Sequence, residues 1–211
     1  MAIVDTEEEF DWSAPFDRNA TGVGHMRRIG ELQAVFDRHG NRPVYPVGTP
    51  IATTPVSIDA LRPIFADGRA IVGTHLHPWV TPPLTEEVSA RNSFPGNLDA
   101  ALEAAKLRTL TDQIAEAFGE RPTIYKAGRY GAGPNTFAIL ERLGYQVDVS
   151  ARPPFDFRPI HGPDFSRRGN APRWEGPTGK ILSIPNSGDY VGLLARMGLA
   201  GIGDMAMAPA G

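Results

Sequence analysis

The sequence predicts an α/β protein built on a parallel sheet. Short apolar runs typical of strands alternate with amphipathic segments of helical length, in the order βαβαβαβαβ as far as residue 150. Strands separated in this way pair in parallel through right-handed crossovers. Charged and aromatic side chains follow several of these strands, at the edge where barrels and open α/β sheets both place their sites. A barrel and a doubly wound open sheet fit the pattern equally well.

The first half of the chain supplies three strands and two helices. The run AIVD at residues 2–5 predicts a strand that stops at a carboxylate. From residue 24 to residue 39, apolar residues recur with a helical period, and Gly40 closes this amphipathic helix. A second strand, a short helix that Ser57 or Asp59 can cap, and a third strand follow at residues 43–48, 57–68 and 70–75.

The second half begins with a long connection. Residues 77–96 are rich in proline, and a connection of this length inside a compact domain is usually functional. The strongest helical stripe covers residues 98–118 and ends at Gly119. Two strands then flank a helix that Pro134 opens and Gly144 closes, at residues 123–128, 134–144 and 145–150. An irregular stretch, a sixth strand and a terminal helix complete the chain at residues 152–176, 180–187 and 189–198.

The composition bounds the domain organisation and the partners. A chain of 211 residues with 41% hydrophobic content can build one sizeable core, so we expect a single domain over residues 1–211. The net charge of −3 gives no positive field that would attract nucleic acid. Because the chain has no cysteine, any metal must be held by imidazole and carboxylate groups. Neither a secretory leader nor a membrane-spanning run is visible, so the sequence predicts a cytoplasmic protein that acts away from membranes.

Three clusters of chemically capable side chains follow three of the predicted strands. In chain order they are the acidic group Asp5, Glu7, Glu8, Glu9 and Asp11, the pair His75 and His77, and the group Lys126, Arg129 and Tyr130. Residues i and i+2 of a strand point to the same side, so the two imidazoles can share one ion. One carboxylate and two neutral imidazoles form a ligand set for a divalent cation such as zinc, and a further carboxylate can act as a general base.

Each cluster also has a purely structural interpretation. Acidic runs are usually solvated, and an HxH pair without a third partner is as often a pair of hydrogen-bonded core histidines as a pair of ligands. Trp79 and Phe94 can close the mouth of a barrel or form an apolar wall for a sugar ring. The residue pattern leaves these alternatives open.

Five stretches together resemble the polysaccharide deacetylase family, also called the NodB-homology domain or carbohydrate esterase family four. In the family's order they are VDTEEEFDW, GTHLHPW, YKAGRYGAGPNTFAILERLGY, VDVS and ILSIPNS. The resemblance implies a distorted (β/α)7 barrel, and it therefore favours the barrel over the open sheet. The chain stops soon after the fifth stretch, which leaves open whether the barrel is complete.

The resemblance also implies a base and three metal ligands. The first stretch supplies the base, Asp5, and one ligand, Glu7, with Glu8 as the alternative ligand. The second stretch supplies two ligands, His75 and His77. The expected metal is zinc, with cobalt, nickel or manganese as alternatives. The two histidines are two positions apart where the family has four, so a bulge or turn is needed to aim both at one ion.

The remaining positions fit the family less closely. The place of an arginine that orients the base is held by Lys126, a point charge without a bidentate fork, with Arg129 as the alternative. Asp148 matches the aspartate that supports this arginine. The family's last histidine, which is the general acid, has no counterpart, and His161 is the spare histidine that could replace it. The residues expected to contact substrate are Trp79, Tyr130 and Leu182.

Three functions compete on this basis. The leading hypothesis is metal-dependent hydrolysis of an N-acetyl group, or of a related C–N amide bond, on a sugar or small molecule. The missing general acid and the substituted arginine motivate the second hypothesis, a degenerate barrel that binds a carbohydrate or metal without turnover. An amidohydrolase-type barrel ranks below both, because its HxH pair follows the first strand and here the pair follows the third.

Overall fold

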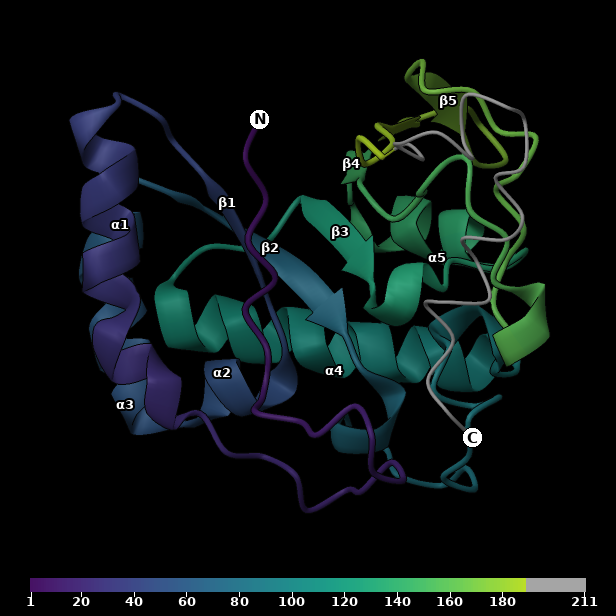
Figure 1. Ribbon diagram of the computed structural model, residues 1–211, viewed down its shortest axis with the longest axis horizontal. Coiled ribbons are helices and arrows are strands. Elements are labelled where there is room, and N and C mark those ends of the chain that lie inside the picture. Colours follow the sequence, from purple (N-terminus) through teal and green to yellow (C-terminus); the bar gives the residue numbers. More distant parts are fainter. Residues whose placement is uncertain (189–211) are drawn as a thin grey trace, which may run out of the picture.

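A six-stranded sheet organises the protein in the computed structural model, which describes residues 1–188 (Figure 1). The strands lie in the order β1-β2-β3-β4-β6-β5, and all neighbours are parallel except β5, which runs antiparallel to β6. In chain order they are β1 (Val44–Val47), β2 (Ile71–Leu76), β3 (Ile124–Ala127), β4 (Val147–Asp148), β5 (Arg173–Glu175) and β6 (Ile181–Ser183). The predicted α/β class with a mostly parallel sheet is confirmed.

The N-terminal segment runs beside β1 without forming a regular strand. The Val4 N–H donates to the carbonyl of Val44 at 3.0 Å, and the Thr6 N–H donates to the carbonyl of Pro46 at 3.0 Å. Pro46 has no N–H, so it cannot donate a backbone hydrogen bond back to the N-terminal segment. The pairing is therefore limited to two isolated bridges. The strand predicted over residues 2–5 is therefore an extended segment that is paired in parallel with β1.

The helices agree with the predicted order. The helix expected over residues 24–39 is a 3-10 turn followed by α1, and α2 was not predicted. Asp99 caps α4 by accepting from the N–H groups of Ala101 and Leu102, and Gly119 ends it with φ 77°. The helices are α1 (Ile29–Arg38), α2 (Thr49–Thr53), α3 (Pro55–Ala66), α4 (Ala100–Phe118) and α5 (Thr136–Leu143). The helix expected over residues 189–198 lies outside the described residues.

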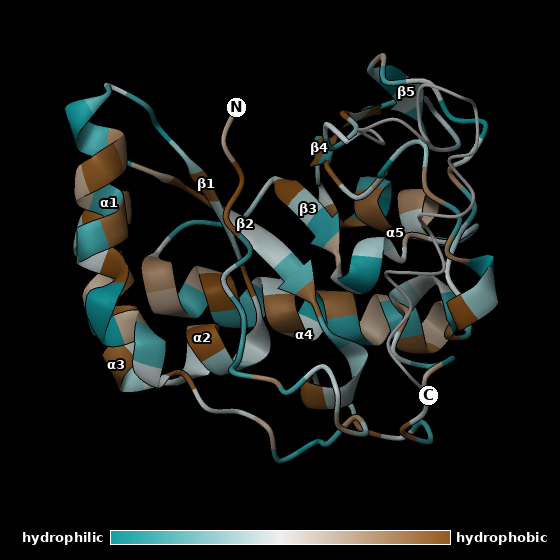
Figure 2. Ribbon diagram, viewed as in Figure 1, coloured by the Kyte–Doolittle hydropathy of each residue, from teal (hydrophilic) through white to brown (hydrophobic). Residues whose placement is uncertain are grey.

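The helices gather on one face of the sheet. The main core joins side chains of β1, β2, β3 and β6 to apolar side chains of η1 (Gly24–Arg28), α2, α3, α4 and α5. Hydrophobic and hydrophilic residues alternate around α1 and α4, as expected for helices with one buried side (Figure 2). The opposite face carries a smaller cluster built on Val44, Ile124 and Val149.

The sheet does not close within residues 1–188. Its order is linear, with the N-terminal segment paired onto β1 at one edge and β5 at the other. The short strand β5 lies in the stretch predicted to be irregular, and it pairs with β6 across a turn. The closed (β/α)7 barrel expected from the resemblance is thus not seen, although helices on one face of a parallel sheet are the winding that a barrel requires.

None of the helices in this part of the chain is long and apolar enough to cross a bilayer. The single domain over residues 1–211 and the cytoplasmic location stay predictions.

Candidate metal centre

Strand alternation brings five chemically capable side chains to one face of the sheet. His75 and His77 are two positions apart at the end of β2, and the register sets His75 beside Lys126 of β3. β1 lies on the other side of β2, and Thr6 of the N-terminal segment is bridged to Val47 of β1. Because neighbouring residues of an extended chain alternate, Asp5 and Glu7 point to the face opposite that of Thr6. This is the face that carries no helix core.

The carboxylate of Glu7 meets both imidazoles. Its Oε2 atom lies 2.9 Å from Nε2 of His75 and 3.4 Å from Nε2 of His77. One ligand atom from each of the three residues lies within 4.8 Å of the others. The structure thus joins Glu7 to the HxH pair, which by itself is a weak signal.

The outward nitrogens of the two histidines are held by acceptors. Nδ1 of His77 lies 2.8 Å from Oε1 of Glu8, and Nδ1 of His75 lies 3.2 Å from the carbonyl oxygen of Lys126. With a cation bound, the acceptor at each Nδ1 keeps a ring proton there, which leaves Nε2 free to coordinate. Both rings therefore present their ligating nitrogen toward Glu7.

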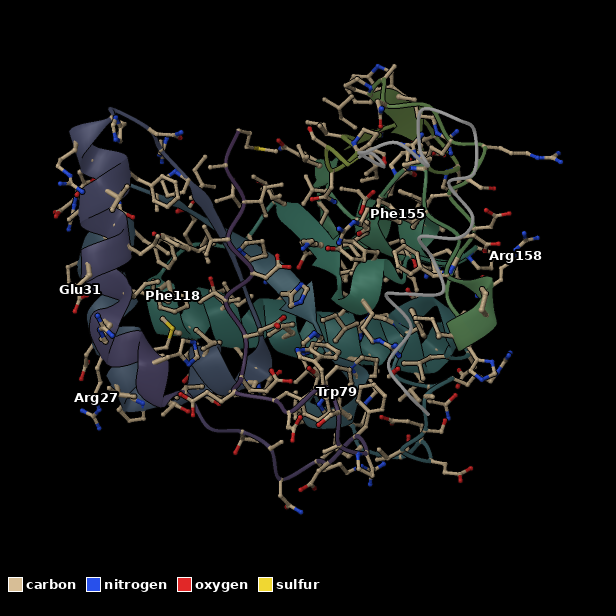
Figure 3. All side chains as sticks on the ribbon, in the orientation of Figure 1. Arg27, Glu31, Trp79, Phe118, Phe155 and Arg158 are labelled. Atoms are coloured by element: carbon tan, nitrogen blue, oxygen red, sulfur yellow. The ribbon has the colours of Figure 1, made fainter. Side chains whose placement is uncertain are left out.

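Packing fixes the plane of the His77 ring. The Trp79 indole stacks on it with a centroid separation of 4.2 Å and an interplanar angle of 21°. On the β3 side, a Cβ added at Gly128 would come within 2.5 Å of Cδ2 of His77, so glycine is needed there. Trp79 is buried beside the end of β2 (Figure 3), so it positions this imidazole and does not line the pocket.

The three residues fit a divalent cation. Nε2 of His77 is buried and has no hydrogen-bond partner among residues 1–188, and such an atom calls for an ion or a water. Two imidazole nitrogens and a carboxylate oxygen are the donors that zinc binds in catalytic sites. The oriented Nδ1 atoms are the outer contacts that metal-binding histidines usually make.

Opposite charges in the site stabilise the charged forms of Glu7 and His77. Burial by itself would raise the pKa of Glu7, but the hydrogen bond from His75 and the positive charges of His77, His75 and Lys126 lower it to about 2. Burial by itself would lower the pKa of His77, but the charges of Glu8 and Glu7 raise it above its ordinary value. The carboxylate is therefore ionised at neutral pH, as a metal ligand must be.

Asp5 and Lys126 form an ion pair beside this cluster. The ammonium is buried, whereas the Asp5 side chain stays 35% exposed. Lys126 thus takes the position from which a cation can hold the predicted base. Both residues line a pocket of about 220 Å³, together with Glu7, Trp12, His75, His77, Arg129 and Tyr130.

Trp12 is a pocket residue that the sequence analysis did not single out. It is 49% exposed and lies edge-on to the rings of His77 and Trp79. Its neighbours Phe10 and Phe16 stack on each other with their centroids 5.3 Å apart. The aromatic residues of FDWSAPF were the sequence signal that could have identified Trp12 as a pocket residue. An exposed tryptophan beside charged strand ends is typical of a binding surface.

Arg129 and Tyr130 line the pocket and have an unusual backbone conformation. Their φ angles are 55° and 61°, in the left-handed region that residues other than glycine seldom occupy. Such a conformation costs about 1 kcal/mol or more per residue. Burial lowers the pKa of Arg129 to about 10.

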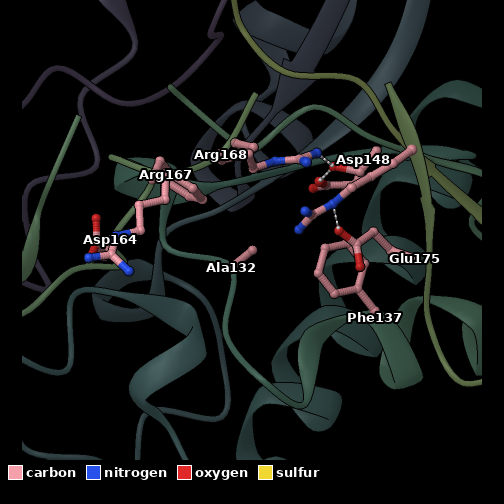
Figure 4. A pocket seen from close by; sticks show the side chains of 11 residues that line it. Ala132, Phe137, Asp148, Asp164, Arg167, Arg168 and Glu175 are labelled. Atoms are coloured by element: carbon pink, nitrogen blue, oxygen red, sulfur yellow. Dashed lines mark hydrogen bonds and ion pairs between the residues drawn. The ribbon is translucent and has the colours of Figure 1, made fainter. Parts of the chain in front are cut away.

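Three predicted site residues lie elsewhere. Asp148 is paired in register with Tyr125, on the face opposite to Lys126, so it does not support Lys126 as expected. It accepts from Ser150 and Ser183 and lines a different cavity with Arg168 (Figure 4). The other two are Leu182, which lies beside Val147 two strands away from β3 and does not line the pocket, and His161, which is exposed.

Comparisons with known proteins identify the fold. No family model and no curated protein matches the sequence. A polysaccharide deacetylase from Mycobacterium smegmatis is similar with a TM-score of 0.54 and 17% identity, over 75% of this chain and 45% of that one. The 4-alpha-glucanotransferase from Thermococcus litoralis has a TM-score of 0.52 and 13% identity, over 87% of this chain and 27% of that one. The chitin deacetylase from Colletotrichum lindemuthianum has a TM-score of 0.45 and 18% identity, over 70% and 53%.

These similarities concern the fold and do not by themselves identify the reaction. The deacetylase structure with a TM-score of 0.54 supports the expected resemblance at the level of the fold. The chain spans about half the length of the first two deacetylase structures. Because a glucanotransferase shares the fold, the reaction has to be inferred from the site.

Proposed function

We propose that this chain, on a fold that polysaccharide deacetylases also have, is a metal-dependent hydrolase that removes an N-acetyl group or cleaves a related C–N amide bond. The substrate class is an acetylated sugar or a small-molecule amide. The observation that carries the proposal is the set of Glu7, His75 and His77, with both Nε2 atoms directed inward and both Nδ1 atoms held from outside.

Glu7, His75 and His77 would hold the cation, and zinc suits these donors best, with cobalt, nickel or manganese as alternatives. A divalent ion at this position supplies Lewis acidity, which polarises a carbonyl oxygen and makes water more acidic. The sequence alternative that Glu8 is a ligand is less favoured, because Glu8 already holds Nδ1 of His77.

Asp5 acts as the general base in this proposal. Its carboxylate is partly exposed in the pocket and forms an ion pair with Lys126, which holds it where it can accept a proton from water. The water adds its oxygen to the amide carbon while Asp5 takes its proton. The C–N bond then breaks, and acetate and a free amine leave. Asp5, which has taken the proton from water, can return it to the amine, and Lys126 beside it is a second group that can donate a proton.

Acetate release tests the reaction. We expect zinc-loaded protein to release acetate from N-acetylglucosamine oligomers, and Asp5→Asn to lower kcat at least about 100-fold with bound zinc unchanged. His75→Ala should lose the zinc itself, measured by mass spectrometry, whereas His25→Ala, which changes an exposed histidine, should keep both zinc and activity.

Two other results would overturn the proposal. Absence of acetate release from folded, zinc-loaded protein on amide substrates would favour the degenerate binding barrel. Transfer of glucose units between glucan chains, with no acetate released, would favour the reaction named for the structural neighbour from Thermococcus litoralis.

A further inference from the structure

The pocket contains a positive charge that the proposed reaction does not use. The Arg129 guanidinium lies over two aromatic rings, 5.1 Å from the Phe16 centroid and 4.1 Å from the Phe94 centroid. It donates to the hydroxyl of Ser93 and, at 3.4 Å, to the carbonyl of Ala90. It forms no ion pair with a carboxylate of residues 1–188, and burial is the cause that lowers its pKa.

The backbone directs this charge into the pocket. Directly after β3 and Gly128, Arg129 and Tyr130 both adopt the left-handed conformation, and both side chains line the pocket. Backbone strain in consecutive residues other than glycine tends to mark functional positions, because the surrounding structure must hold it in place. The rings of Phe16 and Phe94 provide part of that hold.

Tyr130 extends the positive side of the pocket. Arg152 donates to its phenol oxygen and lies over its ring, 4.8 Å from the centroid. Lys126 Nζ is 5.0 Å from the same centroid. Because the phenol oxygen accepts from Arg152, the phenol proton is free to donate to a ligand.

The acidic groups of the pocket are already balanced. Asp5 is paired with Lys126, and Glu7 faces two imidazoles. Arg129 is the pocket cation that is left without a charged partner in the described part of the chain. A desolvated guanidinium favours an oxyanion, which its planar donors can bind by two parallel hydrogen bonds.

We propose that the substrate carries an anionic substituent, a carboxylate or a phosphate, that binds to Arg129 and the hydroxyl of Tyr130. This rests on the proposed function, since it places the anion on the acetylated molecule that the hydrolase acts on. The substrate class is then an acidic N-acetylated sugar, a uronic acid or a sugar phosphate, in place of a neutral glycan.

Calorimetric binding of three matched sugars tests this without any turnover. Glucose is the neutral probe, glucuronate adds a carboxylate, and glucose 6-phosphate adds a phosphate. We expect at least one of the two anions to bind about tenfold or more tightly than glucose, as a charged hydrogen-bonded pair would give. The stronger anion identifies the substituent. Equal affinity of native protein for all three sugars overturns the proposal.

Two variants locate the effect. Arg129→Gln should remove the anion preference, and Arg129→Lys should keep part of it because the charge stays. Arg27→Gln, on the distant side of the molecule in Figure 3, should change nothing. An anion preference that persists in Arg129→Gln, or that appears only in zinc-loaded protein, shows that the anion binds elsewhere. Either result overturns the assignment of the anion site to Arg129.

The outcomes separate this inference from the proposed function. Acetate release from neutral sugars without an anion preference leaves the hydrolase and removes the anion site. Anion binding that depends on Arg129, without acetate release from any substrate, leaves the anion site and removes the hydrolase.

Discussion

Single residues around the metal centre decide which nitrogen each imidazole offers. The carboxylate of Glu8 is fully buried, with Oε1 on Nδ1 of His77. A buried carboxylate is costly unless it is paired, and the imidazole provides the pairing. Glu8 therefore acts on the ligand set through His77, as an outer contact that fixes the tautomer and raises the basicity of Nε2.

Removal of this contact should weaken metal binding without abolishing it. We expect Glu8→Ala to lower zinc affinity about 10–100-fold, because His77 loses its fixed tautomer. Glu8→Gln keeps an acceptor for Nδ1 and should retain most of the affinity. Competition with a chromogenic zinc chelator measures both, and the exposed neighbour Glu9→Gln serves as the control. Unchanged affinity in Glu8→Ala would refute the role.

At the scale of elements, α4 holds its neighbours through buried polar side chains. Lys106 lies in the middle of this helix, and its ammonium donates to the carbonyls of Pro78, Thr81 and Pro83 at 3.0, 2.7 and 2.7 Å. It also forms an ion pair of 3.0 Å with the buried Glu86. One side chain thus ties the long connection after the HxH pair to the helix, and this connection carries Trp79.

Lys106→Met should destabilise the protein strongly. The change leaves three carbonyls and the Glu86 carboxylate without their donor, and loss of one partner of a buried ion pair costs about 3–5 kcal/mol. Urea unfolding measures the free energy of unfolding, with Arg108→Met, an exposed change on the same helix, as the control. Adding Glu86→Gln should recover part of the loss. A loss under about 1 kcal/mol would contradict this account.

Glu103 links α4 to the start of α5. It is buried, its Oε1 accepts from the hydroxyl of Thr136, and its Oε2 has no hydrogen-bond partner in the described residues. Burial raises its pKa to about 7, which the Thr136 hydrogen bond opposes. The side chain is therefore protonated in the folded protein under mildly acidic conditions.

This raised pKa predicts a pH dependence of stability. Between the ordinary carboxyl pKa near 4.5 and about 7, the folded state binds a proton that the unfolded state has lost. Stability therefore falls as pH rises through this range, by about 3 kcal/mol in total. Glu103→Gln should remove that part of the fall, and exposed Glu116→Gln should not. Unfolding curves from pH 4 to 8 measure it, and parallel curves for native protein and Glu103→Gln would disprove it.

At the scale of the whole molecule, the candidate site joins segments that are remote in the chain. Glu7 lies on the N-terminal segment, the histidines end β2, and Lys126 belongs to β3. The N-terminal segment is held to β1 by a few backbone hydrogen bonds and to the pocket by its carboxylates. A bound cation would therefore link the edge of the sheet to its centre.

Zinc should raise the melting temperature. Binding to the folded state at 100 times Kd adds about 2.7 kcal/mol, and for a chain of this size this corresponds to roughly 5–10 °C. Scanning calorimetry with and without zinc measures the shift. Glu7→Gln should show a much smaller shift, while Glu31→Gln on the outer face of α1 should behave as the native protein. An equal shift in Glu7→Gln would place the zinc elsewhere.

Local patterns were sufficient for most of the elements. The helical period and the end residues Asp99 and Gly119 define α4, since caps depend on neighbouring residues alone. Period-2 alternation also placed His75 and His77 on one face. The short helix α2 was missed because Thr49–Thr53 is held by its burial more than by its sequence.

The sequence by itself determined the parallel α/β order of the elements and the residues that carry chemistry at the strand ends, because period and spacing are local properties. Only the tertiary structure decided the partners: Glu7 on the histidines, Glu8 behind His77, and Asp148 on the opposite face from Lys126. It also left the sheet open over residues 1–188, where the resemblance implied a closed barrel. The physical reason is that strand register and edge pairing depend on contacts between distant segments, which the order of residues along one segment does not specify.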